Sequence, residues 1–170
     1  MSAVSDLSAV PQALSGAWHV VGALAPVPCG GAFICRRKSL LPEKRILFVC
    51  IENSNRSQMA EAFARMHGAG VVEAHSAGSR PSGIVNPKAI AAMREKGYDL
   101  SGHTSKSLDD LPDVEWDAVV TMGCGDACPF LKARRREDWA LADPKNLPTE
   151  EFAKVRDEIE RRVTLLISEQ

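Results

Sequence analysis

From residue 44 onward, short apolar runs alternate with amphipathic stretches, and this alternation predicts an α/β fold around a parallel sheet. The compact apolar runs are predicted to form three buried strands and a short fourth strand, at residues 45–49, 71–76, 116–121 and 139–142. Apolar positions at helical spacing predict helices at residues 57–67, at 86–97 and from Thr149 onward. Strand, loop and helix therefore follow one another from the first unit.

Residues 1–43 differ from the rest, because Ser, Ala, Pro and Gly dominate and no helical or strand spacing is sustained. We expect a disordered extension here, followed by one catalytic domain at 44–170. The apolar run from Trp18 is interrupted by Pro26 and is too short for a membrane span, and the only early charge is Asp6. A cytoplasmic protein that does not associate with membranes is therefore predicted.

Composition excludes several functions. The chain has 21 Lys and Arg against 22 Asp and Glu, so it has no basic excess for binding nucleic acid. An odd, sparse set of five cysteines argues against a secreted disulfide framework and leaves thiol chemistry open; they are Cys29, Cys35, Cys50, Cys124 and Cys128. Neither the cysteines nor the histidines have metal-ligand spacing, and no nucleotide-binding motif is present. We expect neither a metal nor a cofactor.

Cys50 follows the first predicted strand, and Arg56 and Ser57 come just before or at the start of the first predicted helix. A loop that turns from a parallel strand into a helix directs backbone N–H groups to one point, where the helix dipole adds positive potential. The loop is predicted to bind a tetrahedral oxyanion through Ile51, Glu52, Asn53, Ser54, Asn55 and Arg56. The positive potential favours the thiolate of Cys50 as a nucleophile, and Ser57 can hydrogen-bond its sulfur. Alternatively, Cys50 is only a small apolar residue at the end of a strand.

The segments Val49-Cys50, Asn53-Ser54 and Arg56-Ser57-Gln58-Met59-Ala60-Glu61 resemble the active site of the low-molecular-weight protein tyrosine phosphatase superfamily, and most closely its thioredoxin-coupled arsenate reductase branch. Further similar segments lie at 76–78, 85–90, 103–105, 119–121, 143–144 and 155–159. The resemblance implies a three-layer flavodoxin-like fold, in which a four-stranded parallel sheet has helices on both faces. It also implies that Asp143 is the general acid, on a loop that closes over the anion. Without it, Asp143-Pro144 would be interpreted as a turn.

A hydrolase needs only Cys50, the anion loop, Arg56 and Asp143, whereas a reductase also needs a source of two electrons. Cys124 and Cys128 follow the third strand, and loops at the carboxyl ends of adjacent parallel strands lie close together. The resemblance implies a Cys50–Cys124 disulfide and then a Cys124–Cys128 disulfide, which thioredoxin or another small dithiol reduces. Alternatively, the two later cysteines are inert buried thiols.

Two features favour arsenate as the substrate over phosphotyrosine. The Asp143-Pro144 pair is followed by Lys145, and residues 79–85 contain no aromatic side chain, whereas related phosphatases have aromatic residues at both places. We therefore predict an arsenate reductase. One alternative is a phosphatase that hydrolyses phosphate monoesters through a Cys50 phosphocysteine, and another is a non-catalytic module that binds oxyanions or senses redox state.

The chain also departs from the pattern of the branch. Glu52 places a carboxylate where relatives often have glycine, so it must point outward or be paired to avoid repelling an anion. Some members bind potassium through residues matching Asn53, Glu61 and Ser76 and an aspartate, but here the last position is Lys106. We expect the Lys106 ammonium to replace that ion by pairing with Glu61. The arginines at 134–136 are expected to form a solvated face.

Overall fold

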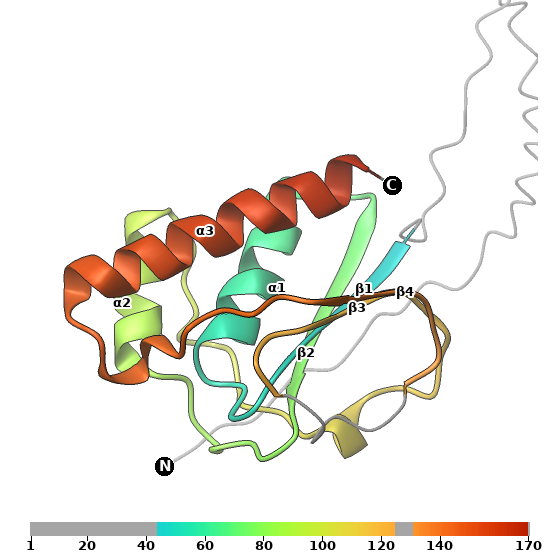
Figure 1. Ribbon diagram of the computed structural model, residues 1–170, viewed down its shortest axis with the longest axis horizontal. Coiled ribbons are helices and arrows are strands. Elements are labelled where there is room, and N and C mark those ends of the chain that lie inside the picture. The colour runs from blue at the N-terminus through green and yellow to red at the C-terminus, as the bar shows by residue number, and fades with distance from the viewer. Residues whose placement is uncertain (1–43, 125–130, 170) are drawn as a thin grey trace, which may run out of the picture. The chain divides into compact units, whose positions relative to one another are not determined.

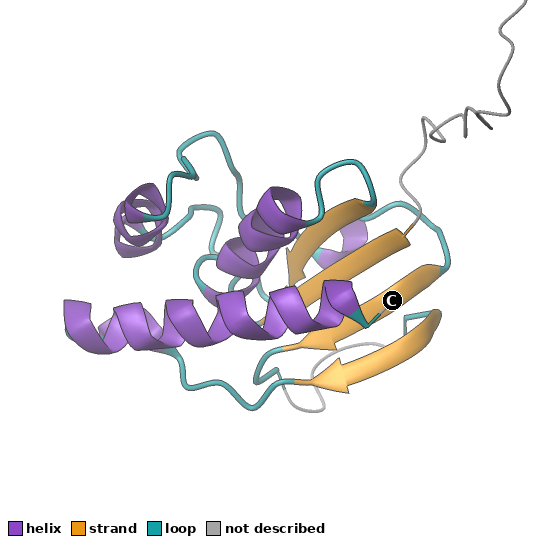
Figure 2. Ribbon diagram, turned by 90° about the horizontal axis from the view of Figure 1, so that it is seen from above, coloured by secondary structure: helices purple, strands orange, loops and turns teal. Residues whose placement is uncertain are grey.

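The computed structural model describes residues 44–124 and 131–169 (Figure 1). Four strands form one parallel sheet in the order β2-β1-β3-β4, and they are β1 (Lys44–Cys50), β2 (Val72–Gly78), β3 (Trp116–Thr121) and β4 (Ala133–Asp138). Within these described residues, the α-helices are α1 (Arg56–His67), α2 (Pro87–Glu95) and α3 (Thr149–Ser168), and the short 3-10 helices are η1 (Leu108–Asp110) and η3 (Pro144–Asn146). The strands lie side by side (Figure 2), and the predicted four-stranded parallel sheet is confirmed.

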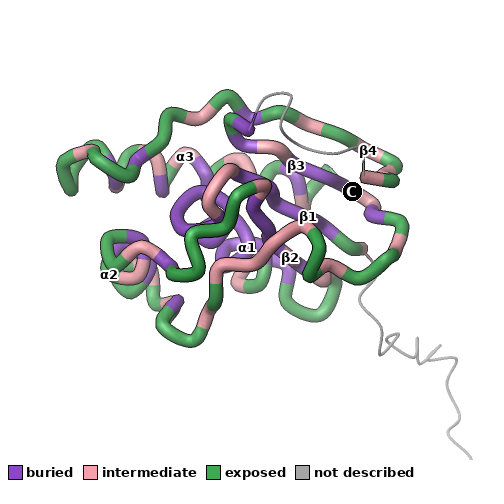
Figure 3. Tube along the Cα trace, turned by 90° about the horizontal axis from the view of Figure 1, so that it is seen from below, coloured by how far each residue is buried: buried purple, intermediate pink, exposed green. Residues whose placement is uncertain are grey.

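Alternate residues of β1 point to opposite faces of the sheet and separate two apolar clusters. Ile46 and Phe48 pack with residues of the three α-helices, including Phe63 and Phe152. Each of these side chains is almost completely buried, which stabilises the fold by roughly 1.5–3 kcal/mol per residue. Burial is concentrated in the central strands and α1 (Figure 3).

The opposite face of the sheet has a thinner cover. Leu47 and Val49 pack there with Trp116, and the partly buried residues against them include Leu108 of η1 and Leu111 just after it. Among the described residues, the three α-helices therefore cover one face of the sheet, and the short 3-10 helix η1 packs against the other.

The fourth strand is not where the sequence analysis placed it. Residues 139–142 are not a strand, and β4 occupies 133–138 instead, including the three arginines expected on a solvated face. This segment has no apolar alternation, but it is an edge strand, where charged side chains are tolerated and oppose further strand pairing. Arg134 pairs with Asp117 of β3 at 3.1 Å, and Arg135 pairs with Glu169 at 2.8 Å. Ion pairs with residues of other elements, and not an alternation of apolar side chains, therefore connect β4 to the rest of the fold.

Most other boundaries agree with the prediction. Asn86 caps α2, because its side chain accepts a hydrogen bond from Lys88 N at 2.9 Å, and Pro87 is the first helical residue. The helix α3 begins at Thr149 as predicted, although no side chain caps it. No helix in the described part of the chain is both long and apolar enough to cross a membrane. The predictions about residues 1–43 and Cys128 lie outside the described residues.

Candidate active site

Cys50 is the last residue of β1, and its side chain is buried at the start of the loop that leads into α1. Its Sγ lies 3.0 Å from Ser57 Oγ and accepts a hydrogen bond from Asn53 N at 3.2 Å. A backbone N–H and a hydroxyl therefore face one sulfur, and both can stabilise negative charge on it. The expected contact between Cys50 and Ser57 is present.

Asn53 holds the anion loop in shape. Its backbone has a φ of +47°, a left-handed conformation that is unfavourable for a residue with a side chain unless the surroundings fix it. Here Nδ2 donates to Ser57 Oγ and to Ser76 Oγ, each at 2.9 Å. Its Oδ1 accepts from Gln58 Nε2 at 2.9 Å and from Lys106 N at 2.7 Å. The side chain thus braces the loop, which leaves the backbone N–H of Asn53 for the sulfur.

Arg56 is the first residue of α1, and only 4% of it is exposed. Its Nη1 donates to Leu141 O at 3.0 Å, and its Nη2 lies 3.4 Å from Asp143 Oδ2. Its Nε is buried without a hydrogen-bond partner, and an unsatisfied buried donor costs about 1–3 kcal/mol. A bound oxyanion would supply the missing acceptor, as the sequence analysis expects for this loop.

Asp143 lies beside Arg56, although the two residues are far apart in the sequence. It is the N-cap of η3, where its Oδ1 accepts from Lys145 N at 3.1 Å. Its side chain is 49% exposed, so the carboxyl group is open to solvent on one side and faces the guanidinium on the other. This position fits a proton donor to an oxygen of an anion held by Arg56.

Glu52 is paired rather than bare. Its two carboxylate oxygens lie 2.7 and 2.9 Å from Lys145 Nζ, and Ser54 Oγ donates to one of them at 3.4 Å. The hydrogen bond from Lys145 is the main cause that lowers the pKa of Glu52, and the same bond raises the pKa of Lys145. The position of Glu52 in the loop predicts a partner or an outward orientation for its carboxylate, and the partner is Lys145.

The remaining loop residues differ in burial. Ile51 is half-buried, and its carbonyl accepts from Arg80 N at 2.8 Å. Ser54 and Asn55 are buried, and Asn55 Oδ1 has no hydrogen-bond partner. Five of the six predicted loop residues therefore lie between β1 and α1, and Arg56 is the first residue of the helix.

Cys124 lies just beyond β3 and is buried on the opposite face of the sheet from Cys50. It packs with Leu47, Val49 and Trp116, and its Sγ donates a long hydrogen bond of 3.9 Å to Val49 O. The structure therefore brings Cys124 to the residue that precedes Cys50, with the end of β1 between them. Both thiols are free, and Cys128 lies outside the described residues.

The sequence analysis missed the role of Gln58, which ties the anion loop to the segment after α2. Its Nε2 donates to Asn53 Oδ1 and to Thr104 O, both at 2.9 Å, and its Oε1 lies 2.9 Å from His103 Nδ1. His103 Nε2 lies 3.1 Å from Tyr98 Oη, so Tyr98 also hydrogen-bonds. Burial lowers the pKa of His103. No apolar pattern indicated this role, because Gln58 lies next to Glu61 on a polar part of α1 that is nevertheless buried.

Lys106 pairs with Glu61, as the sequence analysis expected. Its Nζ lies 3.1 Å from Glu61 Oε2, and the Glu61 side chain is almost fully buried. Ser76 and Arg65 also contact this carboxylate. No group of three or more His, Cys, Asp or Glu within residues 44–124 and 131–169 could hold a metal ion.

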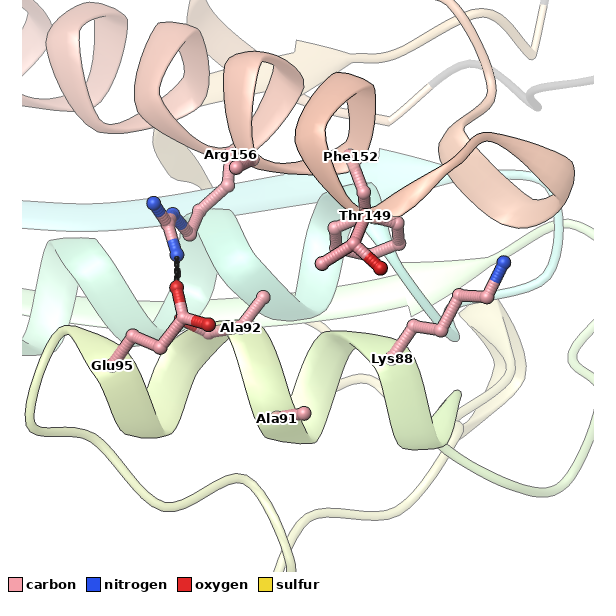
Figure 4. A pocket seen from close by; sticks show the side chains of 8 residues that line it. Lys88, Ala91, Ala92, Glu95, Thr149, Phe152 and Arg156 are labelled. Carbon is pink, nitrogen blue, oxygen red and sulfur yellow. Dashed lines mark hydrogen bonds and ion pairs between the residues drawn. The ribbon is translucent and has the colours of Figure 1, made fainter.

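A separate cavity of about 90 Å³ lies between α2 and α3 (Figure 4). Arg156 forms part of its wall, and its Nη1 donates to Ala92 O at 3.0 Å and to Glu95 at 2.6 Å. These contacts occupy the guanidinium in joining the two helices, so we assign this cavity a structural origin.

The fold and this loop together define a class of α/β protein, in which a strand-end cysteine and a buried arginine surround space for a tetrahedral anion. The family model for low molecular weight phosphotyrosine protein phosphatase matches residues 45–170. The chain therefore belongs to this family.

Relatives within the family are more specific. The chain is 41% identical over 128 residues to a glutaredoxin arsenate reductase of Synechocystis sp.. This match covers 74% of this chain and 97% of the relative. It is 44% identical over 123 residues to an arsenate reductase of Staphylococcus aureus (strain Newman), with 70% of this chain and 92% of the relative covered.

The solved structures that match the fold include arsenate reductases as well. An arsenate reductase in the phosphate-binding state matches with a TM-score of 0.69 and 41% identity over 74% of this chain and 98% of that one. A thioredoxin-dependent arsenate reductase of Corynebacterium glutamicum matches with a TM-score of 0.62 and 32% identity over 75% of this chain and 62% of that one.

Proposed function

We propose that the protein is an arsenate reductase that uses a cysteine relay. The observation that carries this proposal is the position of a second buried thiol, Cys124, against the carbonyl of Val49, next to the candidate nucleophile Cys50. A hydrolase has no need for that thiol. The names of the relatives and of the matching structures support the same activity.

In the first step, the Cys50 thiolate attacks arsenic(V) and an oxygen leaves as water, with Asp143 supplying a proton. Arg56 and the loop N–H groups hold the remaining oxygens. In the second step, the Cys124 thiolate attacks the Cys50 sulfur. The sulfur–arsenic bonding pair then stays on arsenic, so arsenite leaves with two more electrons and a Cys50–Cys124 disulfide remains.

The third step transfers the disulfide outward. Cys128 attacks Cys124 and regenerates Cys50, and an external dithiol such as thioredoxin reduces the Cys124–Cys128 disulfide. The thioredoxin-dependent relative supports a dithiol donor. Cys124 must leave its apolar cluster during the cycle, because bridging two cysteines requires Cα atoms within roughly 7 Å and side chains that face each other.

The proposal is tested by arsenate-dependent oxidation of NADPH in the presence of thioredoxin and thioredoxin reductase. We expect turnover by the wild type and its loss in Cys50→Ser, Cys124→Ser and Cys128→Ser. The double variant Cys29→Ser/Cys35→Ser is the matched control and should keep full activity. Hydrolysis of p-nitrophenyl phosphate that survives loss of Cys124 and Cys128, without arsenate turnover, would instead establish the phosphatase.

A further inference from the structure

The ion pair between Glu52 and Lys145 joins the two halves of the candidate active site. Glu52 belongs to the anion loop, whereas Lys145 belongs to η3, 93 residues later in the chain. Both carboxylate oxygens of Glu52 lie within 2.9 Å of Lys145 Nζ. The Glu52 carbonyl is also held, by Ser105 Oγ at 2.8 Å and by Ser82 N at 3.1 Å. The carboxylate therefore extends from an anchored point of the loop.

The residue that receives this tether is coupled directly to Asp143. The backbone N–H of Lys145 donates to Asp143 Oδ1 at 3.1 Å, so the cap of η3 and the tethered lysine belong to one short turn. Leu147 N closes that turn by donating to Pro144 O at 3.0 Å. Fixing the Lys145 side chain on the anion loop consequently restricts the Asp143 carboxyl group, which lies 3.4 Å from Arg56.

The ion pair also neutralises the negative charge that Glu52 brings into the loop. An unpaired carboxylate in a loop that binds oxyanions would repel the substrate. Glu52 is ionised at neutral pH, as an ordinary glutamate is, and the hydrogen bond from Lys145 lowers its pKa further. Ion pairs between partly exposed side chains contribute little to folding stability, so stability alone does not account for this contact. Instead, Glu52 lies in the loop that is proposed to bind the anion, and Lys145 lies next to Asp143, the proposed general acid.

We propose that Glu52 and Lys145 form a latch across the candidate active site, which holds η3 and Asp143 against the anion loop and neutralises the loop carboxylate. The two residues are a positioning pair for the general acid and a determinant of anion affinity. This inference rests on the proposed function for its effect on turnover, but its two physical consequences are measurable without turnover.

The charge consequence is measured as the affinity for inorganic phosphate by calorimetry. Lys145→Met exposes the Glu52 charge and should weaken binding on the order of tenfold, whereas Glu52→Gln should not weaken it. The double variant Glu52→Gln/Lys145→Met has no charge at this place and should bind within about twofold of the wild type. Lys154→Met is the matched control, because Lys154 forms an exposed pair with Glu151 away from the site. Equal weakening in Lys145→Met and in the double variant would overturn the charge role.

The latch consequence is measured by hydrogen exchange of the Leu147 amide, which closes η3. Exchange should be roughly tenfold faster in both single variants and in the neutral double variant, because the tether is lost in all three. The exchanged pair Glu52→Lys/Lys145→Glu restores the tether and should bring the rate back toward the wild-type value. In the arsenate assay, kcat should fall in the variants whose Leu147 amide exchanges faster, whereas KM should rise in the variant that binds phosphate more weakly. Unchanged exchange in the neutral double variant overturns the latch, whereas absent arsenate turnover in the wild type contradicts only the proposed function.

Discussion

Gly123 lies against the guanidinium of Arg56, so closely that a Cβ on Gly123 would stand 2.7 Å from Arg56 Nη1. Gly123 also has a φ of +72°, in the left-handed region that side chains disfavour. The segment that carries Cys124 therefore begins with a residue whose missing side chain makes room for Arg56, the proposed ligand of the anion. In the proposed cycle, this contact connects the residue that holds the oxyanion, Arg56, with the segment that forms the disulfide through Cys124.

We expect Gly123→Ala to displace Arg56 and to weaken phosphate binding at least several-fold. The left-handed backbone adds a destabilisation of about 1 kcal/mol. Gly102→Ala is the matched control, because a Cβ there would meet nothing within 4 Å. Calorimetry with phosphate and thermal unfolding of both variants measure the two effects. Equal affinities for the two variants would show that the contact does not matter for the anion.

Substitutions at Asn53 test how its side chain stabilises the loop between β1 and α1. Asn53→Gly keeps a backbone that accepts the φ of +47° and loses only the side-chain hydrogen bonds, whereas Asn53→Ala loses the bonds and strains the backbone. Both should be destabilised, and the alanine variant by roughly 1 kcal/mol more. Urea unfolding compares their free energies. A glycine variant less stable than the alanine variant would contradict the strain argument.

Asp143→Asn tests the proposal that Asp143 is the general acid. The substitution keeps the cap acceptor of η3 but removes the proton, so arsenate turnover should fall by roughly 10² to 10⁴-fold. Phosphate affinity should be retained or improved, because a negative charge 3.4 Å from Arg56 has been removed. Steady-state kinetics and calorimetry on the same preparation separate the two effects. A loss of affinity that explains the whole loss of turnover would assign Asp143 to binding instead.

A substitution at Lys106 tests whether its ammonium group takes the place of a potassium ion beside Glu61. Lys106→Ala leaves the buried Glu61 carboxylate with fewer partners, at a cost of about 1–3 kcal/mol. The wild type should melt at the same temperature in sodium and potassium chloride of equal concentration. The variant should melt lower and regain stability preferentially in potassium. A potassium-dependent rise in the wild-type melting temperature would contradict the prediction.

The first strand, the anion loop and the helix α1 were predictable because their signals are local. Cys50, Arg56 and Ser57 lie within one strand-loop-helix unit, and apolar spacing fixed its faces. The strand β4 was not predictable in the same way, because Arg135 is held by Glu169, which is distant in the sequence. Local patterning carries no information about such a partner.

The site shows the same limit. The sequence predicts that the charge of Glu52 needs a partner, but the partner Lys145 could not be identified, because the loop after β4 has to fold back to reach the loop that carries Glu52. The sequence also predicts that Cys124 can approach Cys50, since parallel strands end at one edge, and in the structure Cys124 Sγ lies 3.9 Å from the carbonyl of Val49. It could not show that the two thiols lie on opposite faces of the sheet. That depends on the path of the chain beyond Thr121.

His103 gives the protein a testable dependence on pH. Burial lowers its pKa in the folded state, so the unfolded chain binds a proton more readily. Stability from this residue is therefore fully present above the ordinary histidine pKa of about 6.5 and is lost as pH falls from there through the folded pKa. In the neutral ring, Nδ1 carries the proton that Gln58 Oε1 accepts, because an amide oxygen cannot donate. Protonation adds a proton at Nε2, which then becomes a donor toward Tyr98 Oη.

We expect His103→Gln to reduce the slope of unfolding free energy against pH below about 6.5, because the titrating group has been removed while a polar side chain remains. Urea unfolding of both proteins at a series of pH values from neutral downward measures the two slopes. His67→Gln is the matched control, because His67 is a partly exposed histidine paired with Glu160, away from Gln58. If His103→Gln leaves the slope unchanged while His67→Gln reduces it, the acid sensitivity belongs to the surface pair. The network behind the anion loop would then be insensitive to protonation of His103.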